Sequence, residues 1–155
     1  MHVHIESEIS APAQQVWNIL AHQFGDIATW SSTVETSRSV DQAELPEGVV
    51  ADPRAPVAAR ETKSAFVTAR EYFVQFDDDG MVFTFGALGL PFFLRKAENT
   101  SRVESIDDGS CRLVFDVEMD MWGPFALLSP LMKKRFTKAM NTVHADLKAY
   151  AEQAN

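Results

Sequence analysis

The residue with the clearest capacity for chemistry is Glu71, which lies in a segment of strand character, Thr68–Phe76. If its side chain faces the interior, it is a carboxylate in an apolar chamber, where it can act as a general acid or base. Alternation along the segment leaves the orientation open, because the set containing Tyr72 is as apolar as the set containing Glu71. Arg60 and Tyr72 are further candidates for orienting the polar end of a bound molecule.

Other carboxylates and histidines have simpler interpretations. Asp116, Glu118 and Asp120 alternate with apolar residues, so we expect them on a solvated strand face. His2 and His4 share one face of a strand, but no carboxylate or cysteine accompanies them at a metal-binding spacing. The sequence therefore predicts no metal site.

Nucleophile and nucleotide motifs have no counterpart in this chain. His22 lies near a helix end and His144 on a helix flank, and neither is predicted to be a catalytic base. There is no Gly-x-Ser-x-Gly elbow and no phosphate loop. Gly86 and Gly89 do not form a dinucleotide fingerprint, because the strand-to-helix context is missing. We therefore expect no cofactor.

Composition and charge narrow the function classes. With 155 residues the chain is expected to form one domain, 1–155, and its 11 Phe, 6 Met and 3 Trp can fill a core or line a ligand cavity. The net charge is −8, and because the segment Pro130–Gln153 has five Lys/Arg against two Asp/Glu, the rest carries −11. An acidic body argues against nucleic acid as a partner.

Cysteine usage and hydropathy indicate a cytoplasmic protein. Cys111 is the single cysteine, so an internal disulfide is excluded and a reducing compartment is favoured. The N-terminus lacks the basic and apolar regions of a signal peptide. No apolar run approaches the ~18 residues that span a bilayer, so no integral membrane segment is expected.

The final segment, Pro130–Gln153, organises the predicted fold. Its apolar residues recur at spacings of three and four, which predicts an amphipathic helix of about six turns. Such a helix must lie against a broad surface, and the rest of the chain can supply only a sheet. We expect a space between helix and sheet.

The preceding elements fit that sheet. The sequence predicts a strand over His2–Ser10, a helix with Ser10 as N-cap and Pro12 in its first turn, and a short helix over Phe24–Trp30. Six strands follow, with a long exposed loop at Asp41–Val57, and the expected strands are Val34–Val40, Ala58–Ser64, Thr68–Phe76, Met81–Ala87, Lys96–Ile106 and Cys111–Met121. Short turns between the later strands predict an antiparallel sheet and an α+β fold.

Several stretches resemble the START-like superfamily, also called SRPBCC or helix-grip, and within it the polyketide cyclase/dehydrase-like branch. The resemblance covers almost the whole chain and is carried by Ile9–Trp17, Phe24–Trp30, Arg60-Glu61, Arg70–Asp78 and the final helix. It implies a curved, seven-stranded antiparallel sheet wrapped around a long C-terminal helix, with an apolar cavity between them. Members of the superfamily bind lipids, sterols, plant hormones or aromatic polyketides.

The resemblance also implies positions for functional elements. A cavity-facing glutamate in the plant-hormone-receptor branch corresponds to Glu71, a gate loop to Ser64–Val67 and a latch loop to Gly86–Leu94. Ala58-Ala59 stand where the family usually has a glycine before Arg60, and the gate segment has no glycine. These departures leave a hormone-receptor role poorly supported.

The fold is expected to bring a large apolar set to the cavity and its mouth. With the polar candidates above, the predicted ligand-binding residues are Trp30, Arg60, Phe66, Glu71, Tyr72, Phe83, Phe85, Leu90, Phe92, Phe93, Met119, Trp122, Phe125, Met132, Phe136 and Met140. The leading hypothesis is a monomer or homodimer that binds or carries a small hydrophobic molecule such as a lipid, polyketide or aromatic compound. The alternatives are a polyketide cyclase or dehydratase that uses Glu71, or a module that dimerises through Phe92, Phe93 and Trp122.

Overall fold

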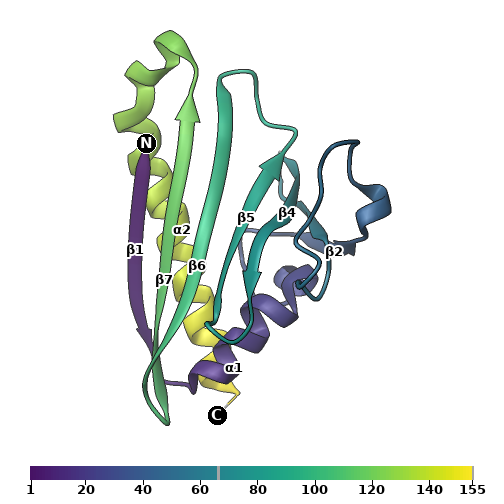
Figure 1. Cartoon of the computed structure of the whole chain (residues 1–155). Coiled ribbons are helices and arrows are strands. Elements are labelled where there is room, and N and C mark those ends of the chain that lie inside the picture. Colours follow the sequence, from purple (N-terminus) through teal and green to yellow (C-terminus); the bar gives the residue numbers. More distant parts are fainter. Residues whose placement is uncertain (66, 155) are drawn as a thin grey trace.

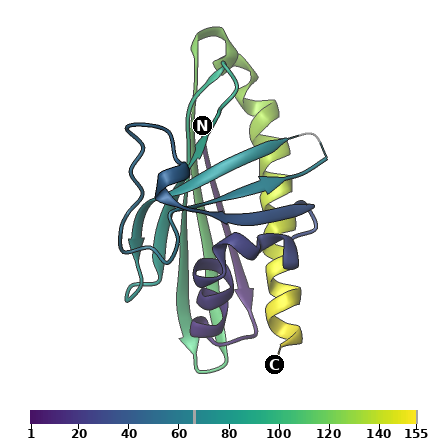
Figure 2. The ribbon, with the colours of Figure 1, turned by 90° about the vertical axis from the view of Figure 1, so that its right-hand side faces the viewer.

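The computed structural model describes residues 1–65 and 67–154 and shows one antiparallel sheet with a long helix along one face (Figures 1 and 2). The strand order is β1-β7-β6-β5-β4-β3-β2, so the first and last strands of the chain lie side by side. The strands are β1 (His2–Ile9), β2 (Thr36–Val40), β3 (Ala59–Lys63), β4 (Thr68–Asp77), β5 (Val82–Leu88), β6 (Leu94–Asp107) and β7 (Ser110–Met121).

Helices occupy the connection after β1 and the C-terminal end of the chain. They are α1 (Ala13–Trp17), which continues as the π-helical turn η1 (Asn18–His22), the 3₁₀ helices η2 (Phe24–Thr29), η3 (Gln42–Glu44) and η4 (Gly123–Leu128), and α2 (Ser129–Gln153). The predicted order of elements and the helix-grip architecture are confirmed. The predicted N-cap is wrong: Pro12 holds that position, and the Ser10 backbone N–H donates to the Glu152 carboxylate at 2.8 Å.

An aromatic core fills one end of the space between sheet and helices. Trp17 and Phe24 pack there against Phe73, Phe76 and Phe83, all at most 1 % exposed. The Trp17 indole N–H donates to the Asp78 carboxylate at 2.7 Å, which ties the first helix to the β4–β5 turn. These five large rings close that end, so any open space must lie farther along the sheet.

The long helix α2 is held mainly through its C-terminal half. Its fully buried residues are Val143, His144, Leu147 and Ala151, whereas Phe136 and Met140, nearer its start, are only partly buried. Polar contacts strengthen the same half, because Ser32 donates to Asp146 through its N–H and its hydroxyl, at 2.8 and 2.7 Å. The first half of the helix therefore stands over the sheet with less support.

The predicted exposed loop Asp41–Val57 is folded over the opposite face of the sheet. Val40, Leu45, Ala51 and Ala59 form a small apolar cluster there, with Tyr72 packed against it. Asp41 and Glu44 form a capping box that starts η3. Within the described residues, no helix has the length and apolar character needed to cross a membrane.

Replacing Leu147 with alanine should destabilise the fold by about 2–5 kcal/mol, because it removes a fully buried side chain where α2 is fixed. Urea unfolding measures the loss, with Leu127→Ala as the control, since that leucine is 84 % exposed on η4. A loss below about 1 kcal/mol for Leu147→Ala would contradict this role of the C-terminal half.

Candidate functional site

A cavity with two compartments lies between the sheet and α2. The inner compartment has a volume of about 120 Å³ and the outer one of about 170 Å³. Glu71, Phe85, Asn99 and Met140 belong to the walls of both and form the boundary between them. Each volume is below the ~300–1,000 Å³ of a typical drug-sized site and close to the roughly 150 Å³ that holds a single ring.

The inner compartment contains an ion pair between a buried arginine and a partly buried glutamate. Arg60 on β3 is 5 % exposed, and its Nε donates to Glu71 Oε2 on the neighbouring strand at 2.6 Å. Its Nη1 also donates to the Phe24 carbonyl at 3.2 Å, and the guanidinium carbon lies 3.9 Å from the centroid of the Phe24 ring. The carboxylate, the carbonyl and the ring face together satisfy a charge that would otherwise be costly to bury.

Three polar atoms on the inner wall find no hydrogen-bond partner among the described residues. They are the indole Nε1 of Trp30, the side-chain amide oxygen of Asn99 and the hydroxyl oxygen of Ser101. A buried polar atom left unpaired costs about 1–3 kcal/mol. The inner compartment is therefore suited to a guest with its own donor and acceptor.

The outer compartment is mainly apolar. Val117 and Met119 of β7, together with Phe136 and Met140 of α2, supply much of its wall. Met140 is shared with the inner compartment, and its flexible thioether can adjust to the shape of a guest. The two compartments thus offer a polar end and an apolar end to one molecule.

The predicted ligand-binding residues fall into separate groups. Trp30, Arg60, Glu71, Phe85, Met119, Phe136 and Met140 lie on the cavity wall. Phe83 belongs to the aromatic core beside the cavity, with its ring centroid 5.2 Å from that of Phe73. Phe66 lies outside the described residues.

The remaining predicted residues gather at the end of the molecule beyond the outer compartment. Phe92 and Phe93, between β5 and β6, pack against Phe125 of η4, with ring centroids 5.3 and 5.8 Å from it. Trp122 lies against the same ring, at 6.4 Å. Leu90 lies in the same connection and Met132 in the first turns of α2, and neither is among the residues that line the compartments.

Tyr72, predicted as a ligand-binding residue, lines neither compartment. Tyr72 faces the covered outer side of the sheet, where it packs over Gly86 and the cluster around Val40. The register of β4 shifts between Phe73 and Gln75, so one extra residue interrupts the strict two-residue period. This bulge is why Phe73 and Phe76, three positions apart, are both buried.

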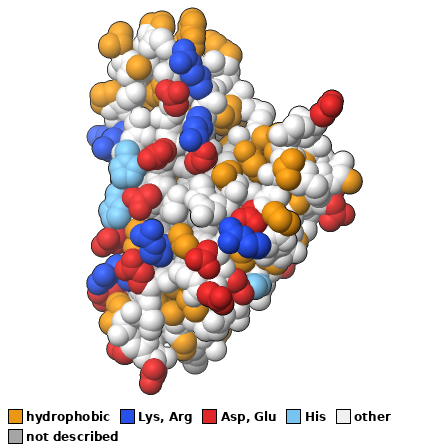
Figure 3. All heavy atoms as spheres, in the orientation of Figure 1, with side chains coloured by type: hydrophobic (Ala, Val, Ile, Leu, Met, Phe, Trp, Pro, Cys, Tyr) orange, Lys and Arg blue, Asp and Glu red, His pale blue; other side chains and the backbone are white. Residues whose placement is uncertain are grey.

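The carboxylates of β7 and the histidines of β1 lie on the outer face, as Figure 3 shows along the β1 edge. Asp116 accepts hydrogen bonds from the rings of His2 at 3.1 Å and His4 at 2.6 Å. The hydrogen bonds that the His4 ring donates to Asp116 and, with a smaller effect, to Glu6 raise the pKa of His4. Among the described residues, no group of three or more His, Cys, Asp or Glu is placed to hold a metal ion.

His144 lies behind the cavity wall. It is 2 % exposed, its Nδ1 is 2.7 Å from the Ser7 hydroxyl, and its ring packs edge-on against Phe115 with centroids 4.2 Å apart. Desolvation by burial lowers the pKa of His144 to about 4. The imidazole is therefore neutral near pH 7, and it supports Phe115, which lines the inner compartment.

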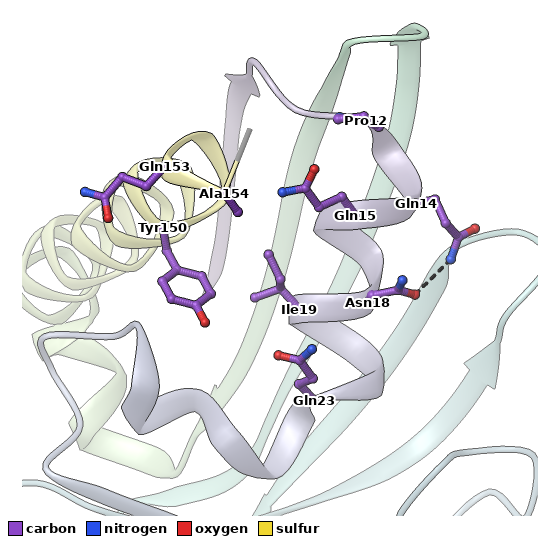
Figure 4. A pocket seen from close by; sticks show the side chains of 9 residues that line it. All are labelled: Pro12, Gln14, Gln15, Asn18, Ile19, Gln23, Tyr150, Gln153 and Ala154. Atoms are coloured by element: carbon purple, nitrogen blue, oxygen red, sulfur yellow. Dashed lines mark hydrogen bonds between the residues drawn. The ribbon is translucent and has the colours of Figure 1, made fainter.

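A wider groove of about 730 Å³ lies outside the sheet–helix space, between α1–η1 and the end of α2 (Figure 4). Ile19 and Tyr150 face each other across it, and the amide side chains of Gln15 and Gln23 border it (Figure 4). A groove open to solvent cannot bury most of a small molecule, as ligand sites do. The smaller enclosed cavity is therefore the better candidate.

Comparison with known families decides the classification. Residues 1–152 match the family model described as "Polyketide cyclase / dehydrase and lipid transport". The chain belongs to this family. No curated protein matches the sequence.

Solved structures agree with the polyketide cyclase/dehydrase and lipid transport family. A START superfamily protein from Mycobacterium smegmatis has a TM-score of 0.76 at 12 % identity, covering 99 % of both chains. The Zhui aromatase/cyclase from Streptomyces sp. R1128 has a TM-score of 0.69 at 14 % identity, covering 99 % of this chain and 94 % of that one. The di-domain ARO/CYC BexL from the BE-7585A biosynthetic pathway has a TM-score of 0.77 at 10 % identity, covering 96 % of this chain and 45 % of that one. At these identities the likeness shows the fold alone.

Asn99 and Ser101 are two polar wall residues that the sequence analysis missed, although a signal for them exists. They lie four and two residues before the buried Val103 on β6, so alternation along a strand places all three on the same face. Small polar residues on a buried strand face must find a partner or line a cavity. The segment Lys96–Ile106 was interpreted only as a polar strand, so this signal was not used.

Breaking the ion pair by Arg60→Met should lower the free energy of unfolding by about 1.5–3 kcal/mol, because the partly buried Glu71 carboxylate is left without its charged partner. Glu71→Gln should cost less, since the amide oxygen still accepts from Arg60. Chemical denaturation measures both, with Arg38→Met as control, because the exposed Arg38–Glu44 pair should contribute little. Equal losses for Arg60→Met and Arg38→Met would contradict the assigned burial.

The stability should fall as the pH drops from about 6.5 towards about 4, because unfolded His144 binds a proton there while folded His144 does not. The slope from this residue reaches at most about 1.4 kcal/mol per pH unit. Urea unfolding across this range should show a weaker pH dependence for His144→Gln than for the unaltered protein. Parallel pH profiles would exclude a buried neutral imidazole.

Proposed function

We propose that this chain binds a small, mostly apolar molecule with one polar end in the cavity between the sheet and α2. The observation that carries the proposal is the group of unpaired polar atoms on Trp30, Asn99 and Ser101, in a compartment whose one ion pair, between Arg60 and Glu71, is already satisfied. Membership of a family described by polyketide cyclisation and lipid transport supports a ligand of this class.

The wall chemistry suggests what the polar end carries. The Trp30 indole N–H can only donate, whereas the Ser101 hydroxyl donates and accepts and the Asn99 amide does both. A phenol, alcohol or carbonyl group matches these atoms without bringing a net charge. The positive charge of Arg60 is already balanced by Glu71 at 2.6 Å, so the site does not call for an anionic group.

The volumes of the two compartments suggest the size of the apolar part of the ligand. Each compartment accommodates roughly one ring, so a one- or two-ring compound fits better than a long acyl chain. Burying about 150 Å² of apolar surface gives roughly 4 kcal/mol, at about 25 cal/mol per Å². The outer wall of Phe and Met side chains supplies this part of the affinity.

A cyclisation or dehydration reaction on a polyketide-like substrate is the second candidate. It is favoured by the position of Glu71 on the boundary between the two compartments. A bound molecule that spans both compartments would lie next to the Glu71 carboxylate. The hydrogen bond from Arg60 occupies one carboxylate oxygen, Oε2. If Glu71 moves a proton, Glu71→Gln abolishes turnover and leaves binding largely intact, and an unaffected rate removes Glu71 from the mechanism.

A matched pair of probes, 2-naphthol and naphthalene, tests the proposed binding function. The naphthol hydroxyl should strengthen binding roughly tenfold by pairing with the inner wall. Its addition should shift the Trp30 indole signal in NMR titrations. Asn99→Leu should remove most of the advantage of naphthol over naphthalene.

A cavity-filling variant provides the control. Ala97→Phe should block both probes by occupying the outer compartment, whereas Ala145→Phe, on the exposed side of α2, should not. Mass spectrometry of solvent extracts from natively purified protein then identifies a resident molecule. Absence of any bound molecule, together with unchanged NMR spectra with every probe, would overturn the proposal.

A further inference from the structure

The end of the molecule beyond the outer compartment carries exposed apolar side chains that the cavity does not use. They form what we call the apolar tip, which consists of Phe92, Trp122, Leu127, Leu128 and Leu131, exposed by 79, 48, 84, 51 and 54 %. These residues come from the β5–β6 connection, η4 and the start of α2, which lie side by side in both ribbon views (Figures 1 and 2). A patch built from three segments is larger than scattered single exposures, which are normal.

Internal contacts give the apolar tip a fixed form. The Trp122 backbone N–H donates to the Phe93 carbonyl at 2.8 Å, which joins η4 to the β5–β6 connection. The rings of Phe92 and Phe93 pack on Phe125, which is partly buried beneath the tip. The exposed side chains therefore project from an ordered base rather than from separate loops.

Positive charge lies next to the apolar tip, at the start of β6 and in the first turns of α2. We call Arg95, Lys96, Lys133, Lys134, Arg135 and Lys138 the basic collar, and it holds six of the 14 Lys and Arg residues of a chain whose net charge is −8. All six are exposed, and among the described residues Lys96 alone pairs with a carboxylate, Glu98 at 2.9 Å. Figure 3 shows Lys and Arg side chains next to the apolar end of the molecule.

Acidic residues are absent from the segments that build this end. No Asp or Glu occurs in residues 80–97 or 121–145, although the chain has 22 of them. Asp120, opposite Lys96 in the β6–β7 register, borders the collar. A cationic cluster on an acidic protein is a local feature, which the net charge alone does not explain.

We propose that the apolar tip and basic collar dock onto an anionic membrane surface. Tryptophan, phenylalanine and leucine are the side chains that enter the boundary between headgroups and acyl chains, and Lys and Arg beside them attract anionic headgroups. The helical collar residues begin about 3 Å and end about 10 Å along α2 from Leu131, at 1.5 Å per residue. That spacing places the charges at headgroup level when the tip enters the bilayer by about 5–10 Å.

The convex shape of the tip favours a bilayer over a protein groove. The η4 segment projects beyond the end of the sheet in both ribbon views (Figures 1 and 2). The outer compartment lies close behind, since Met119 on its wall is two residues, about 7 Å of strand, before Met121 at the base of the tip. Docking here would bring the cavity next to a membrane, but the proposal does not depend on what the cavity binds.

Vesicle flotation with the full chain tests the proposal. Vesicles of phosphatidylcholine alone are compared with vesicles that contain 30 % phosphatidylglycerol, at low and at physiological salt. We expect binding to the anionic vesicles, weakened by salt, and little binding to the neutral ones. Equal binding to both, or no binding to either, would overturn the proposal.

Paired variants separate the two parts of the surface. Phe92→Ser with Leu127→Ser should lower vesicle affinity at least tenfold, while Val50→Ser, at a valine 73 % exposed on the opposite loop, should leave it unchanged. Lys133→Glu with Lys134→Glu should lower it on the order of 20-fold or more, at about fivefold per cation, while Lys63→Glu should have little effect. Far-UV circular dichroism and thermal unfolding confirm that each variant is folded.

Tryptophan fluorescence reports whether the apolar tip enters the bilayer. The emission of Trp122 should shift to the blue on anionic vesicles, and Trp122→Phe should remove the shift, because Trp17 is buried in the aromatic core and Trp30 lines the inner compartment, away from the tip. Light scattering over a dilution series tests whether a second copy of this chain, rather than a membrane, covers the apolar tip. A dimer that dissociates in Phe92→Ser with Leu127→Ser, combined with unchanged vesicle binding in that variant, would overturn membrane docking.

Discussion

The structure depends on an uneven attachment of α2 to the sheet. Leu147 and Ala151 are fully buried and Asp146 accepts two hydrogen bonds from Ser32, so the C-terminal half of the helix is fixed. Phe136 and Met140, about three and two turns before Leu147, are only partly buried. Because a rigid helix cannot bend towards the sheet without losing the contacts of its fixed half, its first half bridges a space that side chains fill incompletely.

The composition of that space follows from the strands beneath it. Arg60 and Glu71 face inward from neighbouring strands, and their ion pair allows both charges to remain in a largely apolar enclosure. Replacing the pair with apolar side chains would satisfy the core equally well, so its presence beside the cavity suggests a role in shaping that space. The unpaired atoms of Trp30, Asn99 and Ser101 suggest the same, because each would be costly in a site without a guest.

The sequence was sufficient for the elements and for their order. The segments Cys111–Met121 and Pro130–Gln153 carried unbroken periods of two and 3.6 residues, and the observed elements differ from the predicted ones by a single residue at their N-terminal ends. The sequence could not show which side chains of β4 face the cavity, because the bulge after Phe73 interrupts the two-residue alternation.

The placement of the apolar tip also escaped prediction, since Phe92 and Trp122 were expected at a cavity mouth and instead project outward around Phe125. Contacts between distant segments, such as that of Arg60 with the Phe24 ring, leave no local signal at all.

Xenon binding tests most directly whether α2 stands off from the sheet. Xenon occupies dry apolar cavities of this size, so a crystal of the protein under xenon pressure should show an anomalous peak among Met119, Phe136 and Met140 in the outer compartment. Substituting Ala97→Phe in the same experiment should remove the peak. A structure without xenon there, with Met140 and Phe85 packed directly against each other across the gap, would contradict the account.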